Sequence, residues 1–108
     1  MLKKSNRLNL KKDFQWVRGG KKLYLSDFTL FIREASIEDP LIGIALSKHN
    51  FKDAVERNRA KRLTSKALED LYPTLRKGIK LVIIPKASVL QKSPEELKGI
   101  FSNVKDIY

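Results

Sequence analysis

The spacing of the hydrophobic positions changes along the first half of the chain, and each change predicts a different element. Residues 10–17 carry apolar side chains at helical spacing, and Gly19-Gly20 supplies a helix stop. Residues 23–34 are rich in aromatic and β-branched residues with rough alternation, which predicts strand structure with a turn or bulge at Ser26-Asp27. Residues 41–47 form an apolar run typical of a strand buried on both faces. The pattern predicts one helix followed by two or three strands.

A longer helix is predicted in the middle of the chain. Asp53 can cap its start through a side-chain oxygen, and Glu56, three residues on, can reach back to complete a capping box. Pro73 stops the helix. The apolar stripe of this helix consists of Ala60, Leu63, Ala67 and Leu71.

The rest of the pattern predicts a strand and a last helix. Residues 80–85 form a short apolar strand beyond Gly78. Ser93 then offers an N-cap, Pro94 stands at the first helical position and Glu96 at the third, an arrangement typical of a helix start. The apolar face of the last helix consists of Leu97, Ile100, Phe101 and Val104.

The length and composition of the chain predict one folded domain. Its 108 residues, of which 42% are hydrophobic, suffice for a single core but not for two. We expect the domain to span residues 1–108. Residues 1–8 are basic and lack a sustained period, so we expect them to form a flexible arm.

The charge limits the class of partner. Lys and Arg total 23 against 12 Asp and Glu, a formal net charge of +11, which favours a polyanion such as nucleic acid or an anionic membrane surface. No apolar run approaches the roughly 18 residues of a membrane span. Leu2 is followed at once by Lys3 and Lys4 instead of a signal-peptide core. We therefore expect a cytoplasmic protein.

The residues that common catalytic sites need are scarce. The chain has no cysteine, and His49 is its one histidine. A metal site built from several imidazoles, or a nucleophile paired with a histidine, is therefore not expected. His49 lies in a polar stretch and is interpreted as a surface residue. Asp53 and Glu56 are interpreted as helix-capping carboxylates. We expect neither a catalytic side chain nor a metal site in this chain.

The middle helix carries an unbalanced row of cations. Between Arg57 and Ala67 there is no acidic residue, although like charges one turn apart repel each other. Such a row is often only a solvated face. Here the mixture of Arg, Lys and Asn on a strongly cationic domain favours contact with nucleic acid, because guanidinium groups bind phosphate in bidentate fashion. Asn58, Lys61, Arg62 and Lys66 are predicted to project into solvent, with Arg59 on their flank and Arg57 nearer the apolar edge.

The same segment resembles a family signature. The stretch AVERNRAKRL, residues 54–63, resembles the RNR signature of the bacterial ribonuclease P protein component. The preceding stretch IGIALSKHNFKDA resembles the strand and loop that lead into this signature. Near the N-terminus, LKKDFQWV resembles the family's first helix. The resemblance covers nearly the whole chain. It implies an α/β (α+β) two-layer sandwich of order αβββαβα, similar to a domain of a small-subunit ribosomal protein. It also implies a left-handed βαβ crossover through the RNR helix, against the usual right-handed rule.

The resemblance also implies a function. Members of the family bind a large catalytic RNA and help it remove the 5′ leader from precursor tRNA. The RNA carries out phosphodiester hydrolysis with Mg²⁺, and the protein binds the RNA subunit and the leader. We expect the chain to be the protein subunit of this endoribonuclease, with the ribonuclease P RNA and precursor tRNA as partners, and with neither DNA nor a membrane as a partner.

Two groups of site residues follow from matching the chain to the family's pattern. Phe14 and Phe31 would be core residues by spacing alone, but the resemblance places them in a cleft where rings stack on unpaired nucleotides. The leader-binding cleft would comprise Lys12, Phe14, Arg18 and Phe31. The RNA-subunit face would comprise Lys48, Lys52, Arg57, Asn58, Arg59, Lys61, Arg62 and Lys66.

The chain also departs from the family's pattern. Ser65 stands where many relatives have a further arginine, and Arg18 where many have a second aromatic residue. A second basic cluster near the N-terminus favours phosphate contact, and it consists of Lys3, Lys4, Arg7, Lys11 and Lys12.

Two other classes of protein share part of the pattern. A ribosomal-type RNA-binding protein would show the same charge. A helix-turn-helix DNA-binding protein would need a second helix across a short turn from the basic helix, whereas predicted strands flank that helix on both sides.

Overall fold

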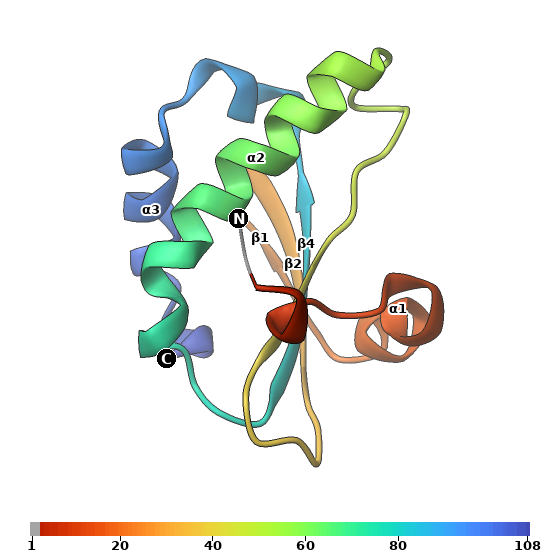
Figure 1. Ribbon diagram of the computed structural model, residues 1–108, viewed down its shortest axis with the longest axis vertical. Coiled ribbons are helices and arrows are strands. Elements are labelled where there is room, and N and C mark those ends of the chain that lie inside the picture. Colours follow the sequence, from red (N-terminus) through yellow and green to blue (C-terminus); the bar gives the residue numbers. More distant parts are fainter. Residues whose placement is uncertain (1–2) are drawn as a thin grey trace.

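A four-stranded sheet organises the chain in the computed structural model, which describes residues 3–108 (Figure 1). β1 and β2 form an antiparallel hairpin whose turn contains the predicted break at Ser26-Asp27. β2 pairs antiparallel with β4, and β3 pairs parallel with β4, in the order β1-β2-β4-β3. The strands are β1 (Lys21–Tyr24), β2 (Phe28–Glu34), β3 (Leu41–Ile44) and β4 (Ile79–Pro85).

The three helices confirm the predicted order αβββαβα. They are α1 (Leu10–Arg18), α2 (Ala54–Leu71) and α3 (Pro94–Ser102). α2 and α3 cover one face of the sheet and α1 part of the other (Figure 1). α2 connects the parallel neighbours β3 and β4, as the resemblance implies, and the left-handed sense of this connection stays a prediction. Among residues 3–108, no helix is long and apolar enough to cross a bilayer.

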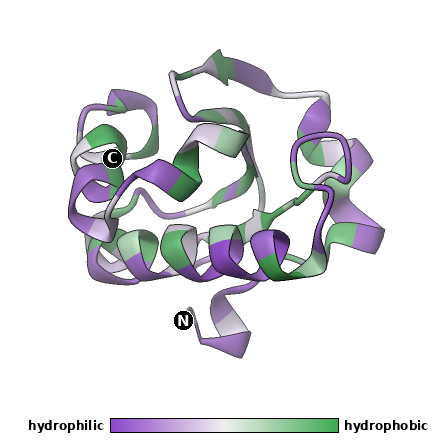
Figure 2. Cartoon of the chain, turned by 90° about the horizontal axis from the view of Figure 1, so that it is seen from above, coloured by the Kyte–Doolittle hydropathy of each residue, from purple (hydrophilic) through white to green (hydrophobic). Residues whose placement is uncertain are grey.

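The core is divided by the alternation of side chains along the strands. On β2, Leu30 and Ile32 belong to the large cluster under α2 and α3, whereas Phe31 faces α1 with Val17 and Val82. Figure 2 shows how hydrophobic and hydrophilic residues alternate along α2, consistent with one face packed on the sheet and one face in solvent. The fold therefore leaves the polar face of α2 uncovered.

The two predicted capping boxes have different outcomes. At α3 the box is confirmed, because the Ser93 hydroxyl accepts a hydrogen bond from the Glu96 amide (3.2 Å) and the Glu96 carboxylate accepts one from the Ser93 amide (3.3 Å). At α2 the predicted box is wrong. Asp53 occupies the N-cap position, but its side chain makes no capping hydrogen bond. The structure holds this helix start in another way, through Arg57.

The last residues of the predicted N-terminal arm are attached to strand β3 of the sheet. Residues Lys4–Asn6 form a 3₁₀ helix, and Arg7 forms an isolated parallel bridge with Ile42. The Leu8 amide donates to the Ile42 carbonyl (2.9 Å), and the Leu8 side chain is buried. These contacts correct the expectation of a flexible arm at Arg7 and Leu8. Residues 1–2 of that arm lie outside the described residues.

A buried carboxylate links the β1–β2 turn to the segment after β4. Asp27 is only 2% exposed, and its carboxylate accepts hydrogen bonds from the hydroxyls of Ser26 (3.1 Å) and Ser88 (2.5 Å). Replacing Asp27 by Ala is expected to lower the free energy of unfolding by about 1–3 kcal/mol, because the Ser88 hydroxyl loses its partner. Urea unfolding measures this change. Equal stability of Asp27→Ala and of the control Glu38→Ala, at an exposed carboxylate, would contradict the prediction.

Candidate nucleic-acid interface

The predicted solvent face of α2 is confirmed. The side chains of Arg59 and Arg62 make no hydrogen bond or ion pair with any other residue of the described chain. Ion pairs of the described residues include Lys21–Asp106, Arg76–Glu34, Lys80–Asp13 and Lys98–Asp70, of which only the last involves α2, at its C-terminal end. The exposed polar residues of this face are Asn58, Arg59, Lys61, Arg62 and Lys66.

Arg57 has a different place from the other cations of α2. It is half-buried, and its guanidinium donates to the carbonyl oxygens of Phe51 (2.8 Å) and Lys52 (3.2 Å). The group predicted to bind RNA is thus engaged within the chain, where it fixes the loop before α2. Sequence reasoning placed Arg57 near the apolar edge of the helix but could not show these two carbonyl partners.

The loop before α2 is held at several points. Phe51 is buried in the core, and the Asn50 side chain donates to the Pro85 carbonyl (3.3 Å) at the end of β4. These contacts leave Lys48 and Lys52 exposed beside the N-terminal end of α2. The loop therefore adds two exposed cations next to the basic helix. His49 is exposed in the same loop, as predicted.

A second polar surface lies on the sheet face that α1 leaves open. Phe31 is only 5% exposed, so its ring forms the floor of this surface and is not an open stacking platform. The Lys22 ammonium lies 5.3 Å from the Phe31 ring centroid and 4.7 Å from that of Tyr24, which is 71% exposed. Phe14 of α1 is half-buried against the same cluster.

Sequence reasoning missed Lys22 and Tyr24. The hairpin register pairs Lys22 with Phe31, and alternation along β1 then places Tyr24 on the same face. A turn placed at residues 25–27 predicts this register, because it sets which residues of the two strands lie opposite each other. The predicted break at Ser26-Asp27 could therefore have identified Lys22 and Tyr24 as residues of this surface.

One flank of α1 is fixed to the sheet. The Arg33 guanidinium lies 4.3 Å from the Trp16 ring centroid and donates to the Trp16 carbonyl oxygen (2.8 Å). Lys80 pairs with Asp13 at 3.3 Å, and both side chains are largely buried. These contacts from β2 and β4 set the position of the helix over the sheet.

The predicted leader-binding residues of α1 do not share one side of that helix. At about 100° per residue, Phe14 and Arg18 lie on the flank away from the Trp16 contacts, towards the open part of the sheet. Lys12 lies on the outer side of α1, opposite the buried Val17. The structure therefore brings Phe14, Arg18 and Phe31 towards one surface and leaves Lys12 apart from it.

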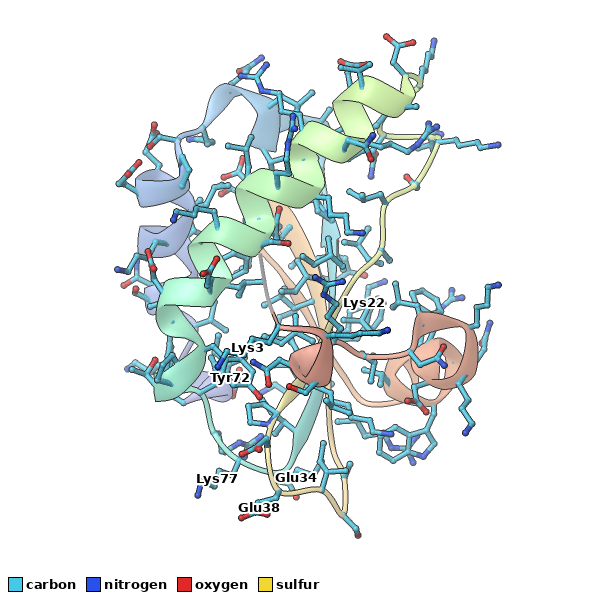
Figure 3. The ribbon with its side chains drawn as sticks, in the orientation of Figure 1. Lys3, Lys22, Glu34, Glu38, Tyr72 and Lys77 are labelled. Carbon is cyan, nitrogen blue, oxygen red and sulfur yellow. The ribbon has the colours of Figure 1, made fainter. Side chains whose placement is uncertain are left out.

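The charges of the domain are distributed unevenly. Residues 48–66 hold seven Lys and Arg against two acidic residues, Asp53 and Glu56. Figure 3 shows the other pole of the molecule, where Glu34 and Glu38 lie near Lys77. In the part of the chain that the structure describes, no group of three or more His, Asp or Glu side chains could hold a metal ion.

The fold and these surfaces define a nucleic-acid-binding α/β domain whose basic helix faces solvent. Comparisons with known proteins all point to one family. The model of the Ribonuclease P family matches residues 2–106. The ribonuclease P protein component of Rippkaea orientalis is 36% identical over 99% of this chain and 92% of its own length, and that of Trichormus variabilis is 35% identical over 83% and 80%.

Solved structures agree on the fold. The ribonuclease P protein of Thermotoga maritima superposes with a TM-score of 0.82 at 23% identity, over 94% of this chain and 97% of that one. The Staphylococcus aureus protein gives 0.77 at 19% identity, over 95% and 94%.

The chain belongs to the bacterial ribonuclease P protein family. It is the protein component of an endoribonuclease that matures the 5′ end of tRNA, and RNA binding follows from that role.

Proposed function

We propose that α2 and the loop before it bind the RNA subunit of ribonuclease P, while that RNA, with Mg²⁺, hydrolyses the phosphodiester bond. The single observation that carries this proposal is the exposed face of α2, where the guanidinium groups of Arg59 and Arg62 have no carboxylate counter-charge within ion-pair distance in the described chain. RNA phosphates supply that counter-charge, because guanidinium groups hold them bidentately. The other proposed contacts of this RNA-subunit face are Lys48, Lys52, Asn58, Lys61 and Lys66.

Within this proposal, Arg57 is a positioning residue. Its bonds to the carbonyl oxygens of Phe51 and Lys52 order the loop before the RNA arrives. A loop ordered in advance loses less conformational entropy on binding. Mg²⁺ is assigned to the RNA subunit and the substrate. The proposal places the complex in the cytoplasm and includes neither DNA nor a membrane.

We further propose that the open sheet face beside α1 binds the 5′ leader of precursor tRNA. Phe14 and Tyr24 offer partly exposed rings, and Arg18 and Lys22 offer cations next to them. Rings stack on unpaired bases of any sequence, and cations follow the backbone. Phe31 supports the surface from below. Lys12, on the outer side of α1, is assigned a phosphate contact outside this surface.

Reconstitution tests the proposed function. The cognate ribonuclease P RNA is assayed on precursor tRNA at low Mg²⁺, with and without this protein. Leader removal is expected to be faster with the protein present, and the protein alone is expected to cleave nothing. An unchanged rate on adding the protein would exclude this function.

Replacing Phe14 by Ala is expected to reduce the discrimination between precursor and mature tRNA by roughly 5- to 150-fold, because one stacked base contributes about 1–3 kcal/mol. Affinity for the RNA subunit should stay nearly unchanged, since α1 and α2 lie on opposite faces of the sheet. Equilibrium binding of both tRNAs to the reconstituted enzyme measures the effect. Ile100→Ala, which also shortens a half-buried side chain but lies on α3, serves as the control.

A further inference from the structure

A groove opens on α2 where this helix meets the start of α3. Its volume is about 420 Å³, within the range of about 300–1,000 Å³ of small-molecule sites. Because α2 and α3 cover the face of the sheet opposite to α1, the groove is separate from the proposed leader surface. Its lining consists of Arg59, Arg62, Leu63, Lys66 and Pro94.

The lining combines an apolar floor with a cationic rim. Leu63 and Pro94 are half-buried, and Leu63 packs against the main core. The other three lining residues are cations, and no acidic residue lines the groove. A ligand that fits this arrangement carries a flat apolar surface and a negative charge on the same small unit. A nucleotide is such a unit, since its base is flat and its phosphate is anionic.

Two acidic residues beside Pro94 constrain the orientation of the ligand. Glu95 and Glu96 follow Pro94 in the first turn of α3, and the Glu96 carboxylate bonds to the Ser93 amide. A phosphate is repelled from that side and attracted to α2. The base therefore belongs on Leu63 and Pro94, with the phosphate on the arginines.

We propose that this groove receives one unpaired nucleotide of the ribonuclease P RNA subunit. The inference rests on the proposed binding of that RNA by α2 and adds a base contact to the phosphate contacts. Bases in a duplex are stacked and cannot enter, whereas an unpaired base in a bulge or joining segment can be turned outwards. The groove thus selects for RNA structure as well as for charge.

A change of polarity without a change of charge tests the groove. Leu63→Gln keeps the length of the side chain but makes the floor polar, and Val55→Gln makes the same kind of change at an exposed position of α2 outside the groove. Binding of the cognate RNA subunit is measured over a range of salt concentrations. Leu63→Gln is expected to weaken binding by about tenfold with the slope of log affinity against log salt unchanged. Val55→Gln should bind like the native chain.

The possible results separate this inference from the proposed function. If the native chain fails to bind the RNA subunit, the proposed function fails. If the native chain binds and Leu63→Gln binds equally well, only the groove inference fails. A decrease in the salt slope of Leu63→Gln would also overturn the inference, because the variant would then have lost phosphate contacts and not a base contact.

A second experiment leaves the five lining residues of the groove unchanged. The chain has no native cysteine, so Glu95→Cys carries a single photoreactive label beside Pro94. Irradiation of the reconstituted enzyme is expected to cross-link this position to an unpaired nucleotide of the RNA subunit. Cross-links confined to paired nucleotides, to precursor tRNA or to a protein, or no cross-link at all, would overturn the inference.

Discussion

Replacing Arg59 and Arg62 together by Ala is expected to lower the slope of log affinity against log salt by about 2. Each phosphate neutralised by a side chain releases counterions, and each contact contributes close to one unit of slope. Both side chains are exposed and lack partners among the described residues, so no internal bond compensates for their loss. Affinity for the RNA subunit should fall by at least about tenfold. Filter binding between 50 and 400 mM salt, concentrations chosen to span about a decade, measures both quantities.

The control for this experiment removes the same charge elsewhere. Lys77→Ala with Lys105→Ala also lowers the formal net charge from +11 to +9, at two exposed positions outside α2. This variant should keep nearly the native slope. If the two double variants lose slope equally, the net charge of the domain and not the α2 face accounts for binding.

Replacing Phe101 by Ala is expected to lower the free energy of unfolding by about 3–5 kcal/mol. Its ring is fully buried and lies 4.5 Å, centroid to centroid, from the ring of Phe28 on β2. Removing it loses hydrophobic transfer energy and leaves a cavity between α3 and the sheet. Because a domain of this kind is stable by only about 5–15 kcal/mol, the change is a large part of the total.

Chemical denaturation of the free protein measures this loss. Tyr24→Ala deletes a ring of similar size at a position that is 71% exposed, and its effect should stay within about 0.5 kcal/mol. A loss below about 1 kcal/mol for Phe101→Ala would contradict the packing described for α3. The RNA subunit should partly restore the stability of Phe101→Ala, because it binds only the folded chain.

The elements that could be predicted from the sequence are those fixed by neighbouring residues. The box at Ser93 and Glu96 is confirmed because both bonds join groups three residues apart. The stripe on α2 is also local, since helical spacing alone places Ala60 and Ala67 on the buried face. The predicted box at Asp53 is wrong although it, too, is local. At that helix start Arg57 makes the bonds that order the chain, and propensities do not rank such alternatives.

The site was harder to predict, because it depends on contacts between distant segments. Whether Phe31 is open or covered depends on where α1 packs, and that position depends on Arg33 and Lys80 from two different strands. The groove depends on Pro94, which is separated from Leu63 along the chain by the second half of α2, by β4 and by the turns on both sides of that strand. Ser65, interpreted as the site of a missing arginine, is buried at 2% exposure and presents no side chain to a partner.

The uneven charge has a consequence for how the complex assembles. A body with a cationic pole and a mixed pole experiences a torque in the field of a polyanion. Encounters with the RNA therefore favour orientations that turn residues 48–66, or the similarly basic residues 3–22, towards it, and fewer collisions are wasted in wrong orientations. Association should be fast at low ionic strength and slow markedly as salt is added, independently of how long the finished complex lasts.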